Sequence, residues 1–174
     1  MKAHNKIWLS LLMFIALLVT MSTPGTASAD NRNFSVHLSG DEEVPARGTL
    51  AQGQAFFQLN KDGTELRYIL IVSNIDNVVA SHIHVGAAGV NGPVVAFLFG
   101  SVPAGGGRTD GVLAEGTITA ANLTGPLAGQ PLNTLLAAME SGNAYVNVHT
   151  NDGVAPPNTG PGDFPGGEVR GQIH

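Results

Sequence analysis

The chain has 174 residues, of which 43% are hydrophobic and 12% are charged; 13 acidic residues outnumber 8 basic ones, giving a formal net charge of −5 at pH 7. This balance, with no basic stripe, argues against nucleic acid or an anionic membrane as a partner. The chain contains no cysteine, which excludes disulfides, redox thiol chemistry and a thiolate-bound metal.

The first 29 residues have the three parts of a secretory signal peptide. Lys2 and Lys6 supply a positive start, residues 7–21 form an almost unbroken apolar run, and small residues at 27–29 provide a cleavage site. The apolar run is shorter than the roughly 20 residues that a membrane-spanning helix needs. We therefore expect cleavage near Asp30, and a secreted or periplasmic mature protein, free of the membrane, whose residues 30–174 form one domain.

Alternation of apolar and polar residues with a period of two dominates the rest of the chain. It predicts about eight strands, at residues 34–38, 54–59, 66–72, 81–85, 94–99, 112–118, 144–149 and 168–173. The segment 60–63 ends in Asp62 and Gly63, a pair typical of a hairpin turn. Short strands with frequent turns predict an all-β fold, an antiparallel Greek-key β-sandwich.

One short helix interrupts this pattern. Pro131 suits a first helical position, apolar residues recur at helical spacing up to Met139, and Gly142 is placed to end the segment. We expect this helix to cover the core. A further single turn is expected at residues 120–123, before Gly125 and Pro126 end it.

Two segments have the composition of loops, and an acidic turn precedes them. Residues 100–111 read as a mobile connection, whereas residues 151–167 contain four prolines and five glycines. Loops of more than about 12–15 residues are uncommon in compact domains and are usually functional or disordered. Because the second loop begins two residues after His149, we expect it to act in the site. The acidic turn at 41–43 is expected to be solvated.

Three histidines carry the functional hypothesis. His82 and His84 alternate in a predicted strand and so share one face, about 6.5–7 Å apart at the backbone. In a later strand, His149 lies on the face opposite its valines. Three neutral imidazoles suit Cu(II) or Zn(II), with an affinity that falls below a pH near 6.5. In the alternative interpretation, His82 and His84 only hydrogen-bond buried loop backbone.

Longer motifs around these histidines resemble a known family. HIHVGAAGVNGPVV at 82–95, YVNVHT at 145–150 and PGGEVRGQI at 165–173, with GDEEVP at 40–45 and LNKDGT at 59–64, are similar to the CHRD domain. That module is repeated in the developmental antagonist chordin and occurs alone in exported bacterial proteins. The resemblance covers residues 34–174 and implies an immunoglobulin-like or Greek-key β-sandwich.

The resemblance also ranks the histidines. His82, His84 and His149 fall on positions where the family carries histidine, whereas His37 and His174 do not and are expected to be incidental. The insert between Thr150 and Pro165 is longer than in many relatives.

A looser similarity links the His-x-His strand to the copper-zinc superoxide dismutase sandwich, although that family's cysteines, bridging histidine and zinc loop are missing. Three functions stay open: an exported copper-binding or zinc-binding protein, an extracellular protein-binding or matrix-binding module without metal, and a copper-only dismutase-like redox enzyme. Additional ligands or supporting residues of a copper site could come from Asp152, Asp163, Glu168 or Asn147.

Overall fold

The computed structural model describes residues 33–174. The predicted signal peptide and its cleavage site therefore lie outside the described residues. Within the described part of the chain, no helix is long and apolar enough to cross a membrane.

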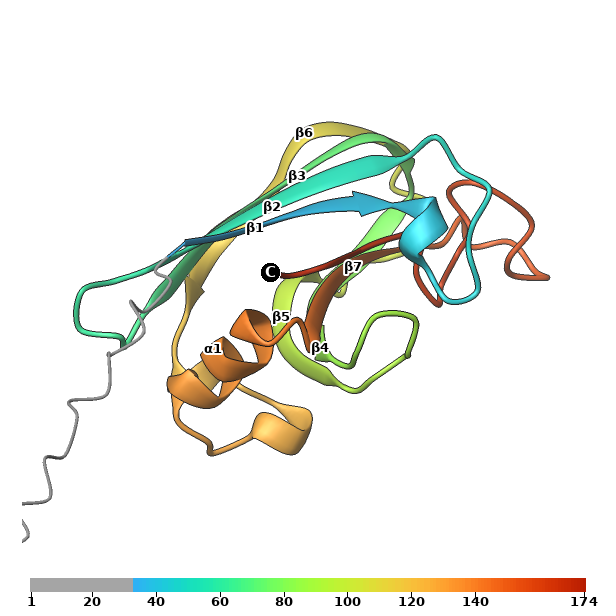
Figure 1. Cartoon of the computed structure of the whole chain (residues 1–174). Coiled ribbons are helices and arrows are strands. Elements are labelled where there is room, and N and C mark those ends of the chain that lie inside the picture. Colours follow the sequence, from blue (N-terminus) through green and yellow to red (C-terminus); the bar gives the residue numbers. More distant parts are fainter. Residues whose placement is uncertain (1–32) are drawn as a thin grey trace, which may run out of the picture.

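Eight antiparallel strands form one strongly curved sheet (Figure 1). The sheet order is β5-β4-β7-β8-β1-β2-β3-β6. The strands are β1 (Asn33–Ser39), β2 (Gln52–Leu59), β3 (Leu66–Asp76), β4 (Val78–Val85), β5 (Val94–Gly100), β6 (Arg108–Ile118), β7 (Ala144–Thr150) and β8 (Val169–Gln172).

The predicted all-β architecture is confirmed, and its two layers are opposite walls of a nearly closed barrel. Neighbours that are distant in sequence, β3 with β6 and β4 with β7, give the crossovers of a Greek-key arrangement. The two end strands β5 and β6 contact each other, which closes the barrel without a ladder of hydrogen bonds between them.

Local sequence explains the turns and helices. Gly63 has φ +71° in the β2–β3 hairpin, the left-handed conformation that the Asp-Gly pair predicts. Helix α1 (Leu132–Glu140) packs four apolar side chains into the core at one end of the barrel (Figure 1). Pro131 is its N-cap, not its first helical residue as predicted, because its ψ of 154° is extended.

Three short 3-10 turns complete the fold: η1 (Gly40–Glu42), η2 (Ala120–Asn122) and η3 (Gly125–Leu127). The second confirms the predicted single turn. The third was not expected, because Gly125 and Pro126 were predicted to end local helical structure. Pro126 instead occupies an early position of η3, where its missing N–H costs nothing.

The alternation along β4 and β7 decides which side chains face outward. Ile83, Val146 and Val148 are fully buried in the core, so their neighbours His82, His84, Asn147 and His149 lie on the other face of the sheet. The loops 43–51 and 151–168 gather at one end of this region (Figure 1). Arg47 Nε donates a hydrogen bond to Gly167 O at 3.2 Å, which joins the two loops.

Candidate metal centre

The three predicted histidines converge. Their ligand nitrogens all lie within 4.8 Å of one another. The pairing of β4 with β7 explains this, because it sets His82 opposite Asn147 and Ala80 opposite His149, so the histidines sit on adjacent strands and one face. The closest pair is His82 Nδ1 and His149 Nε2, 3.1 Å apart. Among residues 33–174, no other group of three or more metal-ligating side chains is this compact.

Loop carbonyls orient two of the three rings. His84 Nδ1 lies 2.8 Å from Gly92 O, and His149 Nδ1 lies 2.9 Å from Pro165 O. Since a carbonyl oxygen only accepts, both Nδ1 atoms carry the proton and both Nε2 atoms keep a lone pair. Histidine ligands of metals commonly donate their second ring N–H in this way. Hydrogen bonding to loop backbone and metal binding were set out above as alternatives. They are compatible, because each ring uses Nδ1 for the backbone carbonyl and keeps Nε2 for a metal.

The free nitrogen of His84 is the least satisfied atom of the site. His84 is 7% exposed, and its Nε2 is buried with no hydrogen-bond partner among the described residues. Leaving a buried polar atom without a partner costs about 1–3 kcal/mol. A metal ion would satisfy it. Nitrogens around a tetrahedral ion lie about 3.3 Å apart at usual metal–nitrogen distances, so separations of up to 4.8 Å would shorten by up to about 1.5 Å on binding.

The rings stay neutral at ordinary pH. Burial, reinforced by His149 and His84, lowers the pKa of His82 to about 4. Burial also lowers the pKa of His84, although the Gly92 carbonyl and the Asn147 side chain act in the opposite direction. For His149, burial lowers the pKa despite the hydrogen bond to Pro165. Neutral imidazoles keep the lone pairs that metal binding requires.

Two aromatic rings enclose the cluster. Tyr145, on β7, stacks on His84 with ring centroids 4.7 Å apart and planes 9° from parallel. Phe97, on β5, meets His82 edge to face at 4.8 Å and remains 54% exposed. The site therefore lies at the surface of the barrel, with one wall formed by an exposed aromatic side chain.

Of the four residues suggested as additional ligands, only Asn147 lies at the rings. Its side chain interacts with His84, and its buried Oδ1 lacks a partner. Asp163 accepts hydrogen bonds from the backbone and hydroxyl of Thr159. Asp152 accepts one from Val154 N, and Glu168 is buried and accepts from Thr49, Thr150 and Gly162. These three carboxylates order loops instead.

Glu43 was missed by sequence reasoning. Asp41 and Glu42 are exposed as expected of a solvated turn, but Glu43 is 5% exposed and its Oε1 has no hydrogen-bond partner among the described residues. Burial raises the pKa of Glu43 to about 7, although Arg170 and Arg47 act in the opposite direction. No local pattern in the sequence distinguishes Glu43 from its acidic neighbours; its carboxylate packs against Gly167, where a Cβ would collide with it.

The loop 151–167 contributes directly to the site through the Pro165 carbonyl. It is tied to the barrel by Glu168, whose carboxylate accepts from Thr150 Oγ1 at 2.6 Å and from Gly162 N at 2.8 Å. His37 and His174 lie outside the cluster, as expected, and line a different pocket.

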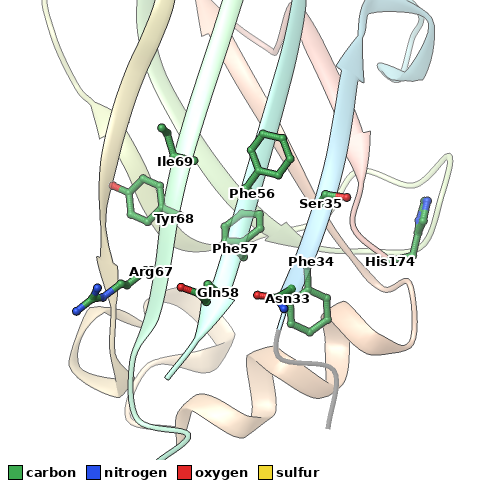
Figure 2. Close-up of a pocket in the computed structure, with 10 residues that line it drawn as sticks. All are labelled: Asn33, Phe34, Ser35, Phe56, Phe57, Gln58, Arg67, Tyr68, Ile69 and His174. Atoms are coloured by element: carbon green, nitrogen blue, oxygen red, sulfur yellow. The ribbon is translucent and has the colours of Figure 1, made fainter. Parts of the chain in front are cut away.

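A groove of about 590 Å³ lies on the outer face of β1, β2 and β3 (Figure 2). Phe56, 45% exposed, and Tyr68 line it together with Arg67. In the sheet order, β8 lies between this groove and the strands that carry the histidines. The two features are therefore independent candidates for binding.

No curated protein and no solved structure matches the chain. A family model does: the CHRD domain matches residues 34–173, the greater part of the sequence and all eight strands. The chain belongs to the CHRD domain family.

Proposed function

We propose that this protein is an exported metal-binding protein in which His82, His84 and His149 together bind one divalent transition-metal ion, with copper preferred over zinc. One observation carries the proposal: the buried Nε2 of His84 has no partner, yet it belongs to a cluster whose ligand nitrogens lie within 4.8 Å of one another. An imidazole held neutral with an unsatisfied lone pair is suited to a metal and poorly suited to a purely structural role.

The donor set supports copper. All three donors are imidazoles, no thiolate exists in the chain, and the nearby carboxylates Asp152, Asp163 and Glu168 are engaged elsewhere. Divalent copper binds such nitrogen sites more tightly than zinc does. Bound copper would supply a centre that exchanges one electron, and His82, His84 and His149 are the residues that would hold it.

Calorimetric titration with Cu(II) and Zn(II), in the presence of a competing chelator, tests the proposal. His82→Ala, His84→Ala and His149→Ala should each weaken copper binding at least tenfold, about 1.4 kcal/mol. His37→Ala is the matched control, because His37 is exposed on β1, and it should behave like the parent. Circular dichroism checks that each variant is folded. Equal affinities of the parent and the His82→Ala/His84→Ala double variant would refute the site.

The groove beside Phe56 favours a second candidate, an extracellular protein-binding or matrix-binding module that needs no metal. An exposed aromatic residue in a concave surface is a typical anchor point for a partner side chain. Binding of the purified protein to a matrix or cell-wall fraction tests it. Phe56→Ser should reduce that binding, and the double histidine variant should not. The opposite pattern would exclude the groove.

A further inference from the structure

A buried cation lies behind the candidate metal centre. Arg170, on β8, is 1% exposed, and its guanidinium donates to four neutral acceptors. Three of them belong to the β4–β5 loop: Ala87 O at 3.3 Å, Val90 O at 3.0 Å and Asn91 Oδ1 at 3.2 Å. The same loop carries Gly92, whose carbonyl accepts the Nδ1 proton of His84. Arg170 thus anchors the loop segment that orients this ring.

Arg170 also reaches His84 through an aromatic stack. Its guanidinium carbon lies 3.4 Å from the centroid of the Tyr145 ring. The other face of Tyr145 lies against His84, with ring centroids 4.7 Å apart. Tyr145 Oη accepts a hydrogen bond from Gly92 N at 3.0 Å. Tyr145 therefore contacts both the histidine ring and the residue that accepts its proton.

Gly92 can occupy its place only because it has no side chain. A Cβ at this position would collide with the carbonyl of Val85 at the end of β4. The close approach brings the Gly92 carbonyl within reach of His84 Nδ1. Much of the loop around it is exposed, with Val90 54% exposed, and the hydrogen bonds to Arg170 and Tyr145 are among those that tie the loop to the barrel.

We propose that Arg170 and Tyr145 are positioning residues that lock His84 in the Nδ1–H tautomer, with the Nε2 lone pair presented to His82 and His149. The tautomer part stands on the metal-free geometry alone, whereas its effect on metal affinity rests on the proposed function. Without the anchored carbonyl, a neutral imidazole populates both tautomers. In the Nε2–H form, the proton occupies the nitrogen that the metal needs.

The first measurement uses metal-free protein, so that it is independent of metal binding. Two-dimensional ¹H–¹⁵N multiple-bond NMR at pH 7.5 reports the tautomer of each histidine. His84 should be almost entirely Nδ1–H in the parent. It should become a mixture in Arg170→Gln and Tyr145→Leu. Tyr145→Phe keeps the stack but removes the hydroxyl that bonds to Gly92, so it should shift the tautomer less than Tyr145→Leu does. Arg67→Gln, which removes an exposed arginine on β3, is the matched charge control and should leave it unchanged.

The second measurement is copper affinity, which should fall at least tenfold in Arg170→Gln and stay at the parent value in Arg67→Gln. An unchanged His84 tautomer in folded Arg170→Gln overturns the inference, whatever the metal result. Absence of copper binding by the parent overturns the proposed function but leaves the tautomer result standing. Should Arg170→Gln fail to fold, Tyr145→Leu judged by the same NMR criterion decides.

Discussion

Metal binding at this site should resist acidification better than binding by three exposed surface histidines would. The sequence alone places the loss of metal affinity near pH 6.5, the usual pKa of imidazole. In the structure, burial lowers the pKa of all three rings, and that of His82 to about 4. We therefore predict that the site keeps much of its affinity at pH 5.5.

The magnitude follows from the neutral fraction of each ring. With a pKa of about 6.5, this fraction falls about eightfold between pH 7 and 5.5, so three such rings would weaken binding by about 600-fold. His82, with its pKa of about 4, stays about 97% neutral at pH 5.5 and contributes almost nothing to the loss. The other two pKa values are also lowered, so the total loss should stay below about 70-fold.

Copper affinity measured at pH 7 and 5.5, against a chelator of known protonation constants, tests this prediction. The histidine Cε1–H resonances of metal-free protein, followed from pH 8 to 3.5, provide an independent check, with the His82 midpoint expected near 4. A loss of 600-fold or more, or a His82 midpoint at its usual value near 6.5, would refute the reasoning.

Four further outcomes are expected. The lowered pKa of His82 means that the unfolded chain binds its proton more readily, so the contribution of His82 to the free energy of unfolding should decrease as pH falls from about 6.5 towards 4, measured as the difference between the parent and His82→Ala in urea titrations. The raised pKa of Glu43 acts in the opposite direction: its contribution should fall by up to about 3 kcal/mol as pH rises from 4.5 to 8, measured as the difference between the parent and Glu43→Gln in the same titrations. Copper-loaded protein is expected to consume superoxide faster than the same amount of free copper; an equal rate in a chelator-controlled assay would contradict an enzymatic role. Intact-mass analysis of the exported product should give an N-terminus within a few residues of Asp30, and retention of residues 7–21 would contradict this.

Most of what could be predicted from the sequence came from the alternation of apolar and polar residues along the strands. In β4 and β7, the buried Ile83, Val146 and Val148 identify the core face, so the outward face of the histidines follows without knowledge of register. Their convergence on one point does not follow, because it depends on which residues pair across the two strands. The family resemblance pointed to it, because all three histidines fall on positions where the family carries histidine.

The burial of the residues around the site could not be predicted from the sequence, for a different reason. Glu43 and Arg170 have the sequence context of surface residues, and Arg170 alternates with buried Val169 as an exposed side chain would. Both are buried because loops distant in sequence fold over them, and no local pattern encodes such coverage. The contact of β5 with β6, which nearly closes the predicted sandwich into a barrel, is equally nonlocal.

The seam between β5 and β6 has a consequence for behaviour at high concentration. Unpaired edge strands invite pairing with another chain. Here Tyr68 Oη donates to Leu98 O at 2.7 Å, and Thr124 N donates to Val95 O at 2.9 Å, so two carbonyls of β5 are already occupied. A tyrosine hydroxyl and a short turn thus donate hydrogen bonds that a neighbouring strand would otherwise donate. Protection against strand addition and fibril growth at this edge depends on those two donors.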